Sequence, residues 1–341
     1  MASSLSGLEL PYVMHDDMSF SLLNTYLAPE VSYESYKWRV TLSVPTSYNL
    51  HHIRDKKTDG NTTNNYVAAT PSLYVRHQIN AKMELSAQLR YSLMPPQAKM
   101  FIPGVIMTDF RNLHLSEPST EYENTRSVIM NFKYRNPITS LFFNITGMYE
   151  WNTCPYMLNQ LFIDDYIEGS YSPMKYDGKN LSVNGSISKG LMSGRVAIGL
   201  DATFARVETS TMRQGVVSPY AVSVFSVQPN FKGYLTSWFS MDYRLVYSRN
   251  MMNIESTEIS NYDALKQYLT PTFGLAKEWQ KAIGGEHYYT KFSSGSSANL
   301  ILLDASVRWN VSKKVDISLT AAKVVLNELD DFFQLFVSVL S

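Results

Sequence analysis

Residues that could perform acid–base, nucleophilic or metal chemistry are few and scattered in this sequence. The adjacent His51 and His52 lack both the i, i+4 helical spacing and the cysteine partners of a metal site. Glu286 and His287 lie in a strand-like segment, where neighbouring side chains point to opposite faces, so they do not form a dyad. Cys154 is the only cysteine and cannot form an internal disulfide. We therefore expect no enzyme activity, no cofactor and no metal site.

Charged residues at alternate positions of strand-like segments are better candidates for a functional site. Both signs of charge occur, always on the side of a segment whose other side is apolar. Facing the lumen of a closed sheet, these residues would line a path through it; the simpler alternative is ion pairing across neighbouring strands. The candidates are Arg76, Glu84, Arg90, Glu150, Arg195, Asp201, Asp242, Arg244, Asp304 and Arg308.

Aromatic residues in the long connections are the second group of candidates. Exposed rings there could stack on a small nutrient ligand such as a sugar, whereas anchoring at a membrane interface explains Trp151 equally well. These residues are Phe110, Tyr122, Trp151, Tyr156 and Tyr171.

The elements that must position these residues are amphipathic strands, of which the clearest pair spans 180–204. Leu181, Val183 and Ile187 alternate with polar residues, and the same alternation resumes after a short glycine-containing link at 189–193. Two amphipathic strands of about ten residues satisfy the requirement for a transmembrane β-hairpin. A half-buried hairpin in a soluble sandwich has the same pattern, so the prediction depends on whether the pattern repeats.

The pattern repeats along the chain, and short links alternate with long ones. This alternation is typical of outer-membrane barrels, whose turns are short on one side of the membrane. The sequence therefore predicts an all-β fold, an antiparallel transmembrane β-barrel of which roughly 14–15 strands are present. Residues 1–18 are expected to be irregular, 19–325 to form the barrel, and 326–341 to form a tail that is either a last strand or a helix. The long connections are expected at 51–65, 93–124, 152–179, 205–219, 250–266 and 293–297.

Composition agrees with a membrane barrel and excludes other classes. The 341 residues carry 30 basic and 30 acidic side chains without a basic block, so nucleic acid is not an expected partner. The 23 Tyr, 16 Phe and 5 Trp residues are enough to form aromatic girdles. No apolar run is long enough for a transmembrane helix, and the first residues do not read as a signal peptide.

Several segments, taken together, resemble the TonB-dependent outer-membrane receptors of Bacteroidetes, in the C-terminal portion of the barrel. The resemblance implies a 22-stranded barrel, a separate plug domain, energy supplied through TonB, and import of a nutrient such as a glycan or a metal chelate. The plug and the early strands of such a barrel are not encoded in these residues, so we expect the late part of a larger barrel. The chain departs from the family pattern in ending on Ser341 rather than on an aromatic residue. The matching segments are 26–45, 103–113, 133–144, 182–191, 212–215 and 303–321.

The first hypothesis is thus the barrel part of a TonB-dependent receptor, located in the outer membrane and in contact with its lipid. The alternatives are a self-contained passive porin-like or structural barrel and, from another class, a soluble β-rich surface binding module.

Overall fold

The computed structural model describes residues 18–55, 60–94, 104–109, 112–116, 121–163, 166–255, 257–276, 278–312, 315–325 and 334–340. Within these ranges the regular elements are β-strands, apart from one short helical turn at Met192–Gly194. No helix in the described residues is long and apolar enough to span a bilayer.

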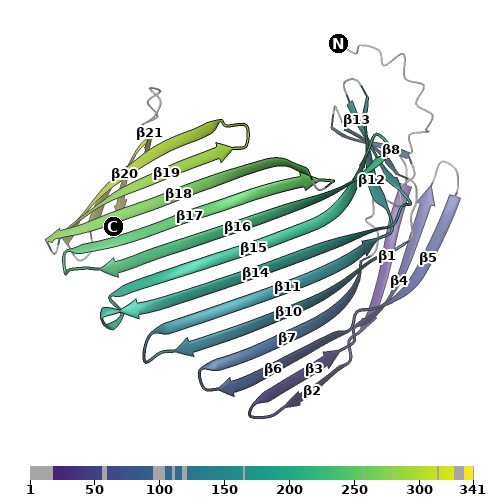
Figure 1. The fold of residues 1–341 in the computed structure, drawn as a ribbon, viewed down its shortest axis with the longest axis horizontal. Coiled ribbons are helices and arrows are strands. Elements are labelled where there is room, and N and C mark those ends of the chain that lie inside the picture. The colour runs from purple at the N-terminus through teal and green to yellow at the C-terminus, as the bar shows by residue number, and fades with distance from the viewer. Residues whose placement is uncertain are drawn as a thin grey trace.

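Most strands form one antiparallel meander, in which each strand pairs with the next one of the meander (Figure 1). Of the nineteen strands of the large sheet, four form a separate extension described below, which leaves fifteen in the meander of the described residues. They are β2 (Glu30–Glu34), β3 (Trp38–Ser43), β6 (Ser72–Asn80), β7 (Met83–Met94), β10 (Glu123–Asn136), β11 (Leu141–Cys154), β14 (Tyr176–Leu191), β15 (Val196–Arg213), β16 (Val216–Tyr234), β17 (Phe239–Ile254), β18 (Thr257–Ala276), β19 (Trp279–Phe292), β20 (Ser297–Ser312), β21 (Val315–Val325) and β22 (Gln334–Leu340).

The predicted all-β, antiparallel fold with about 14–15 strands is confirmed, but the sheet is not closed. Within the described residues β2 pairs with β3 and β22 pairs with β21, and no pairing joins these two edges. Because the strands alternate in direction along the fifteen-stranded meander, the two edge strands run the same way. The sheet is strongly twisted, and β20 and β21 lie at the opposite end of the view from β2 and β3 (Figure 1).

A line of prolines bends the first three strands of the sheet. Pro29, Pro45 and Pro71 lie at the same level of adjacent strands, where a residue without an N–H group interrupts the ladder. Each proline carbonyl accepts a hydrogen bond from the neighbouring strand, at 3.0, 2.8 and 3.0 Å. Beyond this line the chain continues as a three-stranded sheet that turns away from the meander (Figure 1). Its strands are β1 (Met18–Leu27), β4 (Thr46–Asp55) and β5 (Gly60–Ala69).

Four short strands form an extension at the same end of the meander, which we call the loop side. β12 (Met157–Ile163) pairs with β13 (Tyr166–Ser172), and β8 (Gly104–Asp109) with β9 (Asn112–Ser116). A parallel contact joins β9 to β13, and another joins β12 to the end of β15. The side chain of Gln214 secures the second junction, because its Nε2 atom donates to the Phe162 carbonyl at 3.0 Å.

Five of the six segments predicted as long connections contain β-strands, so the prediction that they are loops was wrong. The segment expected at 51–65 contains strands of the three-stranded sheet, and those at 93–124 and 152–179 contain strands of the loop-side extension. The segments at 205–219 and 250–266 continue the long strands of the meander. β15 and β16 are joined by only two residues, Gln214 and Gly215, both with positive φ (52° and 75°). Positive φ at both central residues is typical of a type I′ turn, which suits the twist of a tight hairpin.

Candidate functional site

The meander has one polar and one apolar face, as the register of its strands shows. Partners in adjacent strands lie on the same face, so a row of partners can be followed across the sheet. One such row is almost entirely polar, and it comprises Arg76, Ser86, Asn131, Thr146, Asn184, Thr203, Ser226 and Ser248. The next row, displaced by one residue, is mainly apolar and comprises His77, Leu85, Phe132, Ile145, Gly185, Ala202, Val227 and Tyr247.

Nine of the ten predicted lumen residues lie on the polar face of the described sheet. The exception is Arg195, which lies in the turn after Met192–Gly194 and therefore outside the strand ladder. The nine residues come from strands across the width of the sheet, so the fold brings them to one surface but not to one point. They are Arg76, Glu84, Arg90, Glu150, Asp201, Asp242, Arg244, Asp304 and Arg308.

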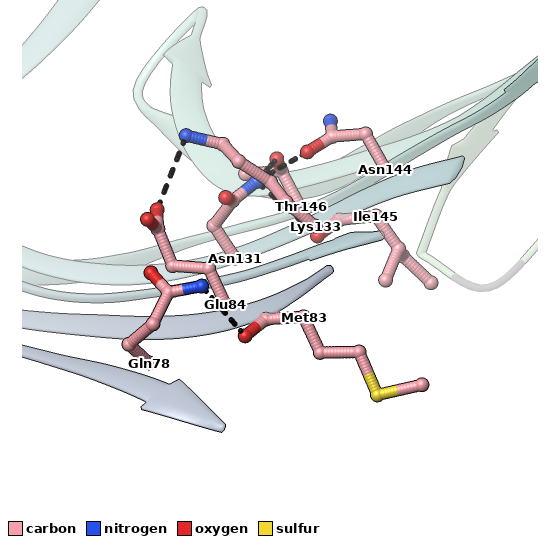
Figure 2. A network of polar contacts seen from close by, with 8 residues as sticks. All are labelled: Gln78, Met83, Glu84, Asn131, Lys133, Asn144, Ile145 and Thr146. Carbon is pink, nitrogen blue, oxygen red and sulfur yellow. Dashed lines mark hydrogen bonds and ion pairs between the residues drawn. The ribbon is translucent and has the colours of Figure 1, made fainter. Parts of the chain in front are cut away.

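Cross-strand ion pairs involve several of these charges. Glu84 lies 3.8 Å from Lys133, beside a network in which Asn131 donates to the Asn144 and Thr146 side chains at 2.9 and 2.6 Å (Figure 2). The other pairs are Arg76–Glu34 at 3.7 Å, Lys232–Asp242 at 3.4 Å and Arg308–Asp316 at 2.5 Å. Exposed pairs of this kind contribute about 0–1 kcal/mol each. For these residues, pairing between strands accounts for the charge without a ligand.

A group of aromatic and charged residues on β17, β18 and β19 has the composition of a ligand-binding surface. The Arg244 guanidinium lies 4.5 Å from the centre of the Tyr268 ring, and the Tyr268 and Tyr288 rings meet edge to face at 5.9 Å. The Tyr288 hydroxyl donates to Glu286 at 2.6 Å, and Lys266 lies over the same ring. Rings with adjacent charges can stack on a sugar or a planar anion.

Sequence reasoning found Arg244 but missed the two tyrosines of this group. Tyr268 and Tyr288 pair with polar-face residues of the neighbouring strands, Arg244 and Lys266 respectively. Their positions within the strand alternation could have placed them on the polar face. The contact between them could not have been found, because it depends on the register of β18 against β19.

The predicted aromatic contacts fall into different places. Tyr156 and Tyr171 meet edge to face at 5.4 Å in the loop-side extension, and Tyr122 packs against Tyr66 of β5 at 4.1 Å. Trp151 is not in a loop, because β11 extends through it and places it on the apolar face, 5.5 Å from Tyr149. Phe110 lies outside the described residues. Tyr156 and Tyr171 are thus the two of the predicted aromatic residues that lie against each other on the loop side.

A buried polar cluster lies where β10, β11 and β14 reach the loop side. The Asn152 side chain donates to Glu123 Oε1 at 2.8 Å and to Cys154 Sγ at 3.4 Å. Burial, with a further contribution from Glu123, raises the pKa of the Cys154 thiol to about 11. Burial also raises the pKa of the neighbouring Tyr156 to about 12. The Cys154 thiol and the Tyr156 hydroxyl are therefore neutral near pH 7 and suit neither nucleophilic nor acid–base catalysis.

The thiol of Cys154 is expected to resist alkylation in the folded protein. A pKa of about 11 instead of 9.0 lowers the thiolate fraction near pH 8 by about 100-fold. Iodoacetamide should react at least that much more slowly with folded than with urea-unfolded protein. Because folding raises this pKa, its contribution to stability is complete below about pH 9 and is lost as the pH rises towards 11. Equal alkylation rates in the two states would contradict the buried position.

Metal-binding geometry is not present in the part of the chain that the structure describes, where no three His, Cys, Asp or Glu residues converge. His51 is buried beside Tyr66, with ring centres 5.4 Å apart, and burial lowers its pKa. His52 points elsewhere and its Nδ1 atom lies 3.1 Å from the Thr63 hydroxyl. His287 lies between Gln267 and Asn299, at 3.2 and 2.9 Å.

Comparisons with known proteins give fold likenesses only. No family model matches the sequence, and no curated protein matches it. A mutant of the ferric enterobactin receptor of Pseudomonas aeruginosa is 9% identical with a TM-score of 0.41; the match covers 89% of this chain but 52% of the receptor. The chain thus spans about half of that receptor's length.

Two other solved structures are similar at a lower level. OmpT, expressed in the outer membrane of Vibrio cholerae, is 12% identical with a TM-score of 0.32 and 95% coverage of both chains. The ferric-catecholate import receptor Fiu of E. coli K12 is 9% identical with a TM-score of 0.24, covering 94% of this chain and 79% of Fiu. At these identities and TM-scores the likeness assigns neither a family nor a function.

Proposed function

We propose that this chain forms the wall of an outer-membrane β-barrel that takes part in the uptake of a nutrient and catalyses no reaction. The apolar face would contact lipid, and the polar face would line the lumen. The observation that carries the proposal is the exposure of large hydrophobic side chains over one face of a single-layered sheet. Among those on this face are Leu42, Leu89, Met130, Ile187, Leu200, Ile283 and Leu319, which are 41–57% exposed.

Exposure on this scale requires a covering phase. Soluble monomers rarely expose a continuous apolar patch larger than a few hundred Å², and here the apolar rows extend from β3 to β21. In the described residues Met157 is the only large side chain that is completely buried, so no hydrophobic core replaces the lipid. Strands of 14 to 20 residues in the middle of the sheet exceed the roughly 9–11 needed to cross a bilayer, so they would project beyond it.

Aromatic residues border the apolar face on both sides, as membrane girdles do. On the turn side, Trp279 and Trp309 stack with ring centres 5.2 Å apart, and Phe239 and Phe273 lie 5.1 Å apart. On the loop side, Tyr149 and Trp151 occupy the corresponding position. This arrangement favours insertion into a membrane over a soluble surface module.

The finer proposal is the barrel part of a TonB-dependent receptor. It is based on the sequence segments that resemble this class. In the assembled receptor, a plug domain and TonB would be the partners of this barrel. The Arg244, Tyr268 and Tyr288 group on the polar face and the Tyr156–Tyr171 pair on the loop side would then contact the nutrient, a glycan or a metal chelate.

Electrophoretic mobility with and without boiling tests the membrane proposal. The purified chain, refolded in detergent or in phosphatidylcholine vesicles, should migrate faster unboiled than boiled and should resist extraction from the vesicles with carbonate. If boiling does not change the mobility and carbonate releases the protein from the vesicles, the membrane proposal is wrong and a surface binding module is the better interpretation.

A passive porin-like barrel is the second candidate, and the small polar side chains along the polar face favour it. Ser86, Thr146, Thr203, Ser226 and Ser248 occupy one row there and would leave room for solute. Vesicles containing the chain alone should then take up small sugars. A receptor barrel that functions only with its plug and TonB should show uptake that depends on both.

A further inference from the structure

We propose that the apolar face carries a binding site for a phosphate-bearing membrane lipid, with Arg126 holding the phosphate and an adjacent groove holding an acyl chain. The inference rests on the proposed membrane insertion and adds to it a defined position and a lipid chemistry. Arg126 is exposed in β10 on the apolar face, where an unpaired charge is costly unless it reaches the headgroup region.

The register places Arg126 at the loop-side limit of the apolar face. One row across four strands reads Tyr91, Arg126, Trp151 and Lys179, so that aromatic and basic residues alternate. The row immediately below it on the same face reads Leu89, Val128, Tyr149 and Leu181. Because adjacent strands are about 4.8 Å apart, Arg126 and Lys179 lie roughly 10 Å from each other, on either side of Trp151.

A groove of about 350 Å³ leads along the apolar face to Arg126. Leu42, Leu73, Leu89 and Val128 form one row of cross-strand partners in its floor, and Tyr91 and Trp151 border it on the loop side. Strands of membrane barrels tilt by about 35–45°, so a row across them is inclined by a similar amount to the membrane plane. The groove therefore descends from Arg126 into the apolar region, as a lipid chain attached to a headgroup would.

Charge at the groove mouth selects an anion. Within the described residues, no carboxylate lies within ion-pair distance of Arg126 or Lys179, whereas Arg206 is paired with Glu208 at 2.8 Å. Glu208 and Asp177 lie near Lys179 on the same face, so Lys179 contributes less positive potential than Arg126. A guanidinium donor set matches the oxygen atoms of a phosphate group. The occupant that satisfies both groove and charge is a lipid with a phosphate headgroup.

The test compares two lipids with the same chains, with and without phosphate. Wild-type protein in detergent micelles should retain dimyristoylphosphatidic acid about tenfold more strongly than dimyristoylglycerol in native mass spectrometry. In the double variant Arg126→Gln, Lys179→Gln, this preference should fall to about twofold or less. The variant Lys82→Gln, Lys175→Gln removes the same net charge from a turn and a connection, and it should keep the wild-type preference. An unchanged preference in the first variant would overturn the proposal.

Chain length tests the groove separately. Dihexanoylphosphatidic acid should be retained several-fold less than the dimyristoyl lipid, because its chains fill less of the groove. Equal retention would show that the headgroup alone binds and would overturn the groove assignment. A wild-type dimer that dissociates on the Arg126→Gln substitution, without any lipid preference, would identify the face as an interface between copies.

Mobility on unboiled gels, recorded on the same samples, separates this inference from the proposed function. A wild-type protein that does not fold into micelles contradicts the membrane proposal itself. A wild-type protein that folds but shows no preference for the phosphate lipid contradicts only the lipid site.

Discussion

The substitution Leu200→Arg should destabilise the protein folded in a bilayer, lowering its free energy of unfolding by about 2–4 kcal/mol. This is the cost of a cation on the lipid-facing surface near the middle of the membrane. Leu200 lies on the apolar face of β15, where its partners are Ile187 and Pro229. The nearest charges on this face are Lys189, on the turn side, and Arg206, on the loop side. Leu200 therefore lies within the apolar face, one row of cross-strand partners from Lys189 and three rows from Arg206.

The same substitution would have little effect if the sheet were soluble. The Leu200 side chain is 41% exposed, and surface substitutions usually change stability by no more than about 0.5 kcal/mol. The size of the effect therefore reports whether lipid or water covers this face. Urea titration of the protein folded into phosphatidylcholine vesicles, followed by tryptophan fluorescence, measures it.

Thr203→Arg is the matched control in the same strand. Thr203 lies on the polar face between Asn184 and Ser226, where an arginine would enter a hydrated lumen. We expect a change of less than about 1 kcal/mol there. Equal effects at the two positions would contradict the assignment of the faces, and a negligible effect at both would favour a soluble sheet.

The part of the fold that could be predicted from sequence is the part that would face lipid. Alternation of apolar and polar residues located β3, β7 and β14 and the turn at Asn80, because lipid contact demands an apolar residue at every second position. The strands between His51 and Asn65 lack this signal. Asn61, Thr62, Thr63 and Asn64 are polar on both faces, so they form a strand only because β4 provides a pairing partner.

The same limit explains the strand ends on the loop side. Thr209, Ser210 and Thr211 of β15 continue the ladder to β16, although the alternation of apolar and polar residues has stopped there. Strand ends that project beyond the proposed membrane would need no apolar face. The faces of the charged candidates followed from the period of two alone, whereas their partners did not. Pairing of Lys232 with Asp242, or of Arg244 with Tyr268, depends on a register that no single sequence segment specifies.

Met157→Ala should detach the loop-side extension from β15 while leaving the meander folded. The Met157 side chain is 1% exposed, and removing a buried methionine side chain costs about 2–5 kcal/mol. Beside this buried side chain, the junction consists of two strand pairs between β12 and β15, Asn159–Met212 and Gln160–Arg213, and of three hydrogen bonds from Gln214 and Gly215 to β12. A junction of this length is small compared with the loss of about 2–5 kcal/mol.

Limited proteolysis of the folded protein measures this opening. Where cleavage follows the population of the open form, a loss of 2 kcal/mol or more raises the cleavage rate within 155–175 by about thirty-fold or more. Met174→Ala is the control, since Met174 is 40% exposed and its truncation should have little effect. The gel mobility of the unboiled meander should be the same in both variants.

The result for Met157→Ala shows whether the Tyr156–Tyr171 pair, a candidate ligand contact, is held independently of the meander. Tyr156 directly precedes β12, and Tyr171 is the second-last residue of β13. The position of both rings therefore depends on the same junction between the extension and β15. If Met157→Ala opens the extension alone, the wall and this aromatic pair are separate cooperative units. Ligand binding could then order the loop side without disturbing the strands of the meander. Loss of the unboiled mobility in Met157→Ala would instead show that the extension and the meander fold as one unit.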